Sequence, residues 1–198
     1  MDSRSGRRHP GRPVPTLVVS LLFLLVGTAA ARAESARPFT VGLHAGVRLF
    51  EEDLDLEDDV AFGLRAGIGA CERFTVLLDF VQSSPARITT GAQASVSALR
   101  GLTQTRLLLG TVRPYLLAGL GGVLFDFDDT SDTAVGAVTA GGGLELRLGS
   151  RAALYAEASA DFYRSRAISY SPEGEVLYAT ERDTQTAWTA LTGIQVEF

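Results

Sequence analysis

Large apolar residues alternate with small or polar residues along most of the chain after residue 38. The stretch 39–50 reads FTVGLHAGVRLF, so Phe, Val and Leu alternate with Thr, Gly, His and Arg. A period of two residues is typical of a β-strand with one apolar face, whereas an amphipathic helix repeats every three to four residues. No segment beyond residue 33 has a convincing helical period. The pattern therefore predicts an all-β protein.

The same alternation predicts eight strands. They span residues 39–50, 62–70, 74–82, a segment within 92–109, 114–125, 135–148, 152–163 and 186–198. The fourth strand is the least regular, because its alternation breaks near Arg100 and Gly101. A β-bulge, which inserts one extra residue into a strand, would produce such a break.

The connections between these strands alternate between short and long. Short links lie at residues 71–73, 110–113 and 149–151, and longer polar links at 51–59, 83–91, 126–132 and 164–183. With eight antiparallel strands, all short links fall at one end of the sheet, together with both ends of the strand series. This layout is that of transmembrane barrels. We therefore predict an eight-stranded antiparallel up-and-down transmembrane β-barrel, closed by pairing of residues 186–198 with residues 39–50.

Alternation alone does not say which face points inward, since a soluble barrel of the lipocalin type carries its apolar face inside. The polar face here combines many glycines with charges of both signs, namely Arg48, Arg65, Arg147, Asp79, Glu145, Glu157 and Asp161. An eight-stranded barrel is just wide enough for its side chains to fill, so a polar lining needs small residues and ion pairs. We expect the polar face inside, with Arg65 near Asp79 and Glu157. The apolar face, which includes Trp188 and Phe198, then contacts lipid.

The first 33 residues have the order of a secretory signal peptide. Four arginines precede the apolar run LVVSLLFLLVG, and Ala31-Arg32-Ala33 offers small residues at the two positions read by signal peptidase. We expect cleavage between Ala33 and Glu34, which leaves residues 34–198 as one barrel domain. A retained membrane helix is the alternative, although the run is barely long enough to span a bilayer.

Charge and cysteine content narrow the possible partners and bonds. Residues 34–198 hold 13 Arg, no Lys and 22 acidic residues, a net charge of about −9. Nucleic acid is therefore not an expected partner. Cys71 is the single cysteine, so no intrachain disulfide can form.

Two features, a histidine and an acidic loop, could carry chemistry. For both, we favour a role without chemistry. His44 is the only histidine after the leader, but no His-x-Ser pattern accompanies it, so we expect it to fill the lumen. Residues 51–59 contain seven acids in nine positions, and Asp126, Asp128, Asp129 and Asp132 follow in a later link. Oxygen-rich loops can bind Ca²⁺ or Mg²⁺, yet the glycine turn and ligand spacing of a calcium loop are missing. We predict no catalytic, cofactor or metal site, and a solvated acidic loop.

Three segments resemble one known family. These are GIQVEF at residues 193–198, RPYLLAGLG at 113–121 and GGGLELR at 141–147. With the strand pattern, they resemble the small eight-stranded outer-membrane β-barrels of Gram-negative bacteria, the OmpA/OmpX-like kind. The resemblance implies a place in the cell outer membrane and a terminal Gly-x-x-apolar-x-Phe read by the barrel-assembly machinery. Leu191 departs from the pattern, since that position usually holds a polar residue.

Function follows less directly, because this fold hosts many activities. We expect a monomer whose partners are outer-membrane lipids and lipopolysaccharide, with a plugged polar lumen. Its expected role is structural, or surface interaction through external loops, with Tyr170 and Tyr178 in the longest loop as possible contacts. The alternatives are a narrow channel for small solutes and, third, a lipid-modifying barrel enzyme.

Overall fold

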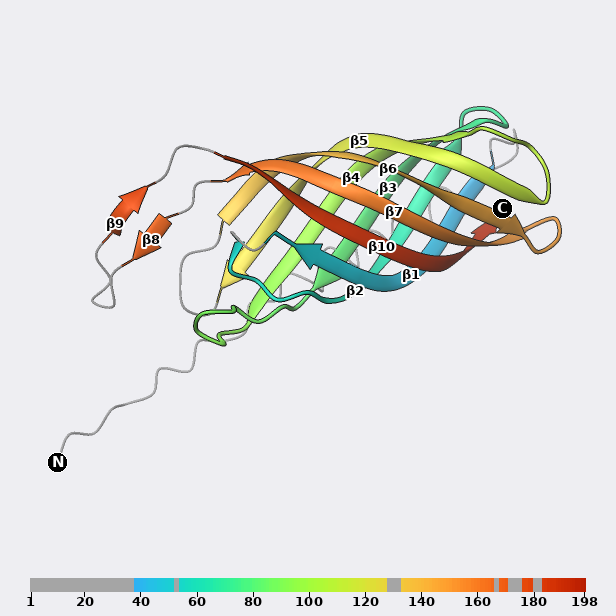
Figure 1. Ribbon diagram of the computed structural model, residues 1–198. Helices are drawn as coiled ribbons and strands as arrows, with labels where there is room; N and C mark the ends of the chain where they lie inside the picture. Colours follow the sequence, from blue (N-terminus) through green and yellow to red (C-terminus); the bar gives the residue numbers. More distant parts are fainter. Residues whose placement is uncertain (1–37, 52–53, 128–132, 166–167, 171–175, 180–182) are drawn as a thin grey trace. The chain divides into compact units, whose positions relative to one another are not determined.

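A computed structural model describes residues 38–51, 54–127, 133–165, 168–170, 176–179 and 183–198. Eight strands form a closed barrel (Figure 1): β1 (Phe39–Phe50), β2 (Asp59–Gly69), β3 (Phe74–Ser83), β4 (Ala94–Arg106), β5 (Val112–Phe127), β6 (Thr133–Arg147), β7 (Ala152–Ser165) and β10 (Asp183–Glu197). Two short strands, β8 (Ile168–Tyr170) and β9 (Val176–Ala179), pair separately between β7 and β10. The predicted fold class is confirmed. The predicted signal peptide lies outside the described residues.

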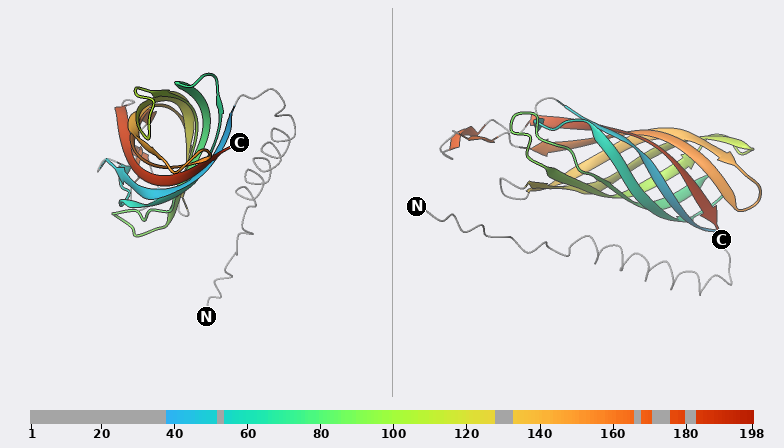
Figure 2. Two further views of the ribbon diagram at one scale, coloured as in Figure 1. Left: turned by 90° about the vertical axis from the view of Figure 1, so that its right-hand side faces the viewer. Right: turned by 90° about the horizontal axis from the view of Figure 1, so that it is seen from below.

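Each barrel strand pairs antiparallel with its neighbours in the chain, and β1 with β10 closes the ring (Figure 2). The closing pair runs from Thr40 opposite Glu197 to Phe50 opposite Ala187. Beyond it, the amide of Phe198 donates to the carbonyl of Phe39 at 2.8 Å. The barrel consequently has no unpaired sheet edge, the requirement for a sheet in lipid.

The two faces of the strands lie as the alternation predicts. Inward positions are mostly buried, while the outward positions expose large apolar side chains, among them Leu43, Phe62, Phe74, Val76, Leu116, Leu120, Leu124, Val138, Leu144, Phe162, Trp188 and Phe198. In water, so continuous an apolar exterior would be unfavourable. Within the described residues, no helix is long and apolar enough to cross a membrane.

The predicted bulge in the fourth strand is wrong. β4 pairs in continuous register with β3 and with β5 across Arg100 and Gly101. Its inward positions are apolar toward the loop end, at Val96 and Ala98, and mixed beyond them, where Arg100, Leu102 and Gln104 are all buried. The inward residues therefore change character while the strand stays regular.

The links follow the predicted order, and the strands run farther at one end than predicted. We call the end with the links at residues 70–73, 107–111 and 148–151 the turn end, and the opposite end the loop end. β2, β5, β6, β7 and β10 all extend past their predicted limits toward the loop end. Backbone pairing continues there after the apolar alternation has stopped, so the pattern underestimates strand length. The β8–β9 hairpin was not predicted.

Inward glycines leave room for neighbouring rings in the lumen. A Cβ atom on Gly143 would lie 2.6 Å from the Tyr115 hydroxyl, and one on Gly193 would lie 2.6 Å from the Tyr155 ring. Both distances are too short for a real contact. The carbonyls of Ala156 and Leu43, on the neighbouring strands, would lie closer still to these two Cβ atoms, so the inward glycines admit both the adjacent strand and the tyrosine rings.

Candidate functional site

The buried charges at the middle of the lumen form one connected group. The Arg65 guanidinium donates to both oxygens of Glu157, at 2.8 and 2.9 Å, and through Nε to Asp79 at 2.8 Å. These contacts confirm the expected neighbourhood of Arg65. They join β2, β3 and β7 across the interior. Because two hydrogen bonds to one carboxylate fix its orientation, the arrangement is rigid as well as neutralising.

Two further arginines complete this central layer. Arg100 donates to Asp79 through Nε at 3.0 Å and lies 3.5 Å from an oxygen of Asp161. Arg48 donates to the other oxygen of Asp161 at 3.1 Å. We call the set Arg48, Arg65, Arg100, Asp79, Glu157 and Asp161 the central ionic layer. Its formal charges balance, which offsets part of the cost of removing them from water.

Arg100 is the member that the sequence analysis missed. The alternation around it suggested a bulge and so left its direction open. Arg100 lies opposite Asp79 in the β3–β4 register. A charged residue paired with a predicted inward residue on the neighbouring strand also faces inward, and this pairing could have identified Arg100 as a lumen residue.

A second polar layer lies near the turn end. Glu145 accepts from Arg106 at 3.1 Å and from the Gln195 amide at 2.9 Å, and Arg113 lies 3.5 Å away. Arg147 is placed outside the buried set, 3.6 Å from Glu197 at the rim. Between the two polar layers lies a small apolar cluster of Leu77, Leu102, Tyr115 and Leu117.

The loop end of the lumen is apolar and includes a residue from outside the strands. A cluster of inward residues from β4, β5, β6, β7 and β10 gathers there, namely Ala94, Val96, Ala98, Val123, Phe125, Ala137, Tyr163 and Ala187. Leu56, from the link between β1 and β2, packs into this cluster and is only 2% exposed. Leu54 packs against it from the same link.

The link that carries Leu56 is fastened to the link between β3 and β4 by backbone hydrogen bonds and by one carboxylate, with the Glu57 amide donating to the Ala86 carbonyl at 2.9 Å. Asp55 accepts hydrogen bonds from the Thr89 amide at 2.9 Å and the Thr89 hydroxyl at 2.6 Å, and Arg87 binds it at 2.9 Å. The Asp55 carbonyl also accepts from the Ile88 amide. We call Asp55, Arg87 and Thr89 the loop latch. Partial burial raises the pKa of Asp55, but these donors outweigh it and hold the pKa below its ordinary value.

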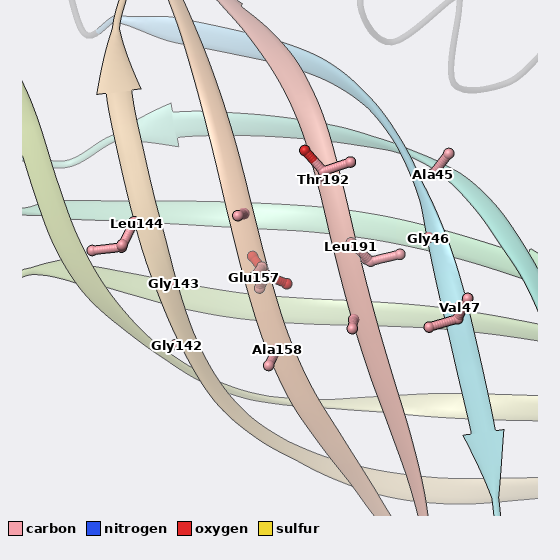
Figure 3. A pocket seen from close by; sticks show the side chains of 12 residues that line it. Ala45, Gly46, Val47, Gly142, Gly143, Leu144, Glu157, Ala158, Leu191 and Thr192 are labelled. Atoms are coloured by element: carbon pink, nitrogen blue, oxygen red, sulfur yellow. The ribbon is translucent and has the colours of Figure 1, made fainter.

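A shallow apolar groove lies on the outer surface, across β6, β7, β10 and β1 (Figure 3). Small residues from these four strands form much of it, namely Ala45, Gly46, Gly142, Gly143, Ala156, Ala158 and Ala190. Val47 and Leu144 also line it. Glu157, Leu191 and Thr192 complete the lining of the groove, which belongs to the largely apolar exterior.

Comparison with known proteins gives a consistent answer on the fold. Neisserial surface protein A shares 13% identity with a TM-score of 0.60, covering 81% of this chain and 97% of that one. OprG of Pseudomonas aeruginosa shares 14% identity with a TM-score of 0.57, covering 82% and 96%. Ail of Yersinia pestis shares 14% identity with a TM-score of 0.54, covering 82% and 98%. The chain has the fold of a small outer-membrane β-barrel.

No protein-family model and no curated protein matches the sequence of this barrel. Its likeness to the solved structures is therefore one of fold. The closed sheet and the apolar exterior require a membrane around it, and among membranes such barrels belong to the bacterial outer membrane. By the layout of that class, the turn end is periplasmic and the loop end external.

The remaining candidate residues take structural positions in the barrel. His44 is buried, its Nδ1 lies 2.8 Å from the Tyr155 hydroxyl, and Asp79 is 3.8 Å away. Leu191, the departure from the terminal pattern, faces inward and packs with Ala61 and Val81. A polar residue there would face two apolar neighbours, which explains the leucine.

The predicted acidic loop is only partly described. Asp55 serves the loop latch, Asp58 accepts from the Phe50 amide, and Asp59 accepts from the Ser84 amide. Among the residues that the structure describes, no three His, Cys, Asp or Glu side chains are grouped to hold a metal ion. Asp128, Asp129 and Asp132 lie outside the described residues, and the side chains of Tyr170 and Tyr178 are not described.

Proposed function

We propose that the protein is an outer-membrane barrel with a plugged lumen that acts structurally or as a surface-interaction protein through its external loops. The observation that carries this proposal is the order of layers inside the barrel. From the loop end, an apolar cluster, the central ionic layer, a second apolar cluster and the Glu145 group follow one another. An ion would have to pass two apolar clusters and separate buried ion pairs.

The external loops are the parts free to meet a partner. The described loop-end residues carry an excess of carboxylates, including Glu51, Glu57 and Asp58. Ail of Yersinia pestis has been solved with the heparin analogue sucrose octasulfate, a polyanion. An acidic loop surface repels polyanions, so for this barrel we propose a cationic or neutral partner. Residues 164–183, the longest loop, are the proposed contact segment.

The expected lipid and assembly partners fit the same proposal. Outer-membrane lipids and lipopolysaccharide would surround the apolar exterior, and the barrel-assembly machinery would bind the C-terminal strand. We propose a monomer, since all eight strands pair within one chain and leave no edge for a second copy.

Planar-bilayer recording tests the plugged lumen. We expect the reconstituted barrel to give no steady conductance steps, while a porin added to the same membrane gives them. The double variant Leu54→Ser/Leu56→Ser removes the apolar residues of the loop and should remain closed, because the central ionic layer is intact. Steady steps from the unaltered protein would contradict the plugged lumen and favour the narrow channel.

The enzyme alternative depends on His44. A lipid-modifying barrel of the lipase type needs a nucleophile beside the histidine and access for the substrate. Here the contacts recorded for the His44 ring are to Tyr155 and Asp79, and the residue is 5% exposed. Release of acyl chains from phospholipid vesicles that is lost in His44→Ala would establish an enzyme and displace our proposal.

A further inference from the structure

The turn between β4 and β5 carries three successive exposed leucines. Leu107, Leu108 and Leu109 are 46%, 62% and 42% exposed, and we call them the leucine turn. The links at the same end between β2 and β3 and between β6 and β7 read ACER and LGSR. Neither contains two large apolar residues in succession. A turn that faced only water would gain nothing from three leucines.

The leucine turn continues the lipid-facing surface. Val112 on β5 lies opposite Leu146 on β6, and both are exposed on the barrel's outer face. From Val112 to Leu124 the outward face of β5 spans roughly 30 Å at ~3.3 Å per residue and a ~40° tilt. An apolar band of about 25 Å is usual for such barrels. A band of that height that ends near Val112 would bring the leucine turn to the boundary between the acyl chains and the headgroups.

Part of the backbone of this turn is hydrogen-bonded within the protein at its two ends, around Leu107 and Gly110. The Leu107 amide donates to the Pro114 carbonyl at 2.8 Å. Arg73 donates to the Leu107 carbonyl at 3.1 Å, and Arg113 donates to the Gly110 carbonyl at 2.9 Å. Carbonyls that accept from protein donors lose less when water is excluded. Arginine also suits this depth, because its stem is apolar while its guanidinium reaches the headgroups.

We propose that the leucine turn inserts into the periplasmic leaflet and anchors one side of the barrel in the headgroup–acyl boundary. The partner is the lipid surface itself, which already covers the adjoining outer face of β5 and β6. The other two turns penetrate less deeply, since the β6–β7 turn offers one exposed leucine, Leu148, and the β2–β3 turn reaches the leucine turn through the Arg73 side chain. The barrel is therefore held more deeply on its β4–β5 side than on its β2–β3 side.

The single cysteine supplies a matched control for a fluorescence test. Cys71 is exposed in the β2–β3 turn, at the same end of the barrel. One sample carries an environment-sensitive fluorophore on Cys71 of the unaltered protein. Two others carry it on Leu108→Cys and on Leu109→Cys, each in a Cys71→Ser background. All three are reconstituted in phosphatidylcholine–phosphatidylglycerol vesicles and checked for folding by the shift in gel mobility on boiling.

The expected result is emission at shorter wavelength from positions 108 and 109, with strong quenching by spin-labelled lipid and weak quenching by iodide. The probe on Cys71 should show the opposite pattern. Iodide quenching at 108 and 109 equal to that at Cys71 would overturn the proposal. So would protection from both quenchers, because it would mean that protein, and not lipid, covers the turn.

Discussion

At the scale of single residues, Arg65 is the most consequential side chain described. It makes three hydrogen bonds to two carboxylates, and its side chain is 2% exposed. We expect Arg65→Leu to lower the free energy of unfolding by about 3–5 kcal/mol, because Glu157 and Asp79 stay buried with fewer partners. Urea unfolding in detergent, followed by the shift in gel mobility on boiling, measures this. An unchanged midpoint would remove Arg65 from the ionic layer.

Arg48 offers the internal comparison. Its recorded hydrogen bond is to Asp161, while its Nε and Nη1 have no hydrogen-bond partner in the described structure. Asp161 still accepts from Thr139 at 2.7 Å if Arg48 is removed. Arg48→Leu should therefore lower the unfolding midpoint less than Arg65→Leu. Equal losses would mean that net charge, and not the particular hydrogen bonds, sets the cost.

Two glycines of β6 distinguish the cost of crowding the lumen from the effect of replacing glycine with alanine in a strand. A Cβ atom on Gly143 would lie too close to the Ala156 carbonyl and the Tyr115 hydroxyl, whereas one on Gly136 would meet nothing within 4 Å. The Tyr115 hydroxyl donates to Glu157 at 3.0 Å. Gly143→Ala should disturb this contact and lower the free energy of unfolding by about 1–3 kcal/mol, the usual cost of overpacking. Gly136→Ala should leave it unchanged or raise it slightly. A loss of similar size in both variants would show that the strand, and not the lumen, resists the added methyl group.

The sequence predicts inward residues well wherever the polar face keeps one character. Arg65, Asp79 and Glu157 could be placed together because each sits in a strand with clear alternation. Arg100 could not, since its strand carries apolar residues inward at one end and a mixture of apolar and polar residues inward beyond them. A rule that equates the inward face with the polar face fails where the lumen itself changes from apolar to ionic.

At the scale of elements, the loop latch helps to hold the β1–β2 link, with Leu56, over the loop end of the lumen. We expect Asp55→Asn to speed amide hydrogen exchange at Thr89 and Ile88, because the neutral side chain loses the charge that Arg87 binds. Exposed Glu57, changed to Gln, is the matched control and should leave exchange at these amides unaltered. Unchanged exchange in Asp55→Asn would show that the backbone hydrogen bonds between the two links and the Leu56 cluster hold the loop without the latch.

The latch also has a defined pH dependence. The pKa of Asp55 in the folded barrel lies below its ordinary value of 3.8, so the charged form is the one favoured by folding. Its contribution is complete above that value and is lost as the pH falls through the lowered pKa. Exchange at Thr89 should accelerate, relative to the intrinsic rate at each pH, only in that acidic range.

Loop structure was the least predictable part of the chain. Asp55 is one of seven acidic residues within nine positions, and no spacing distinguishes the one that forms the latch from the other six. The β8–β9 strands are three and four residues long, too short to show an alternation. Contacts between links depend on how the barrel brings their ends together, which no local pattern records.

At the scale of the whole molecule, closure of the barrel was predictable because it follows from the number of strands and the order of their links. Eight alternating segments, with short and long links in turn, leave the first and last strands as neighbours, and the register confirms it. The layered interior was not predictable in the same way. It depends on where along each strand the inward residues change from apolar to ionic. These changes must lie at matching heights along the barrel axis in all eight strands.

The pairing of β1 with β10 also sets an order of events. β1 is synthesised before every other strand, but its β10 partner lies about 150 positions away in sequence. Pairings across such separations are slow, since the entropy of closing the loop is lost before the contact is gained. Until then, both edges of the growing sheet offer unpaired amides to any other strand. The barrel that has no edge when complete is thus most prone to aggregate just before its last strand arrives.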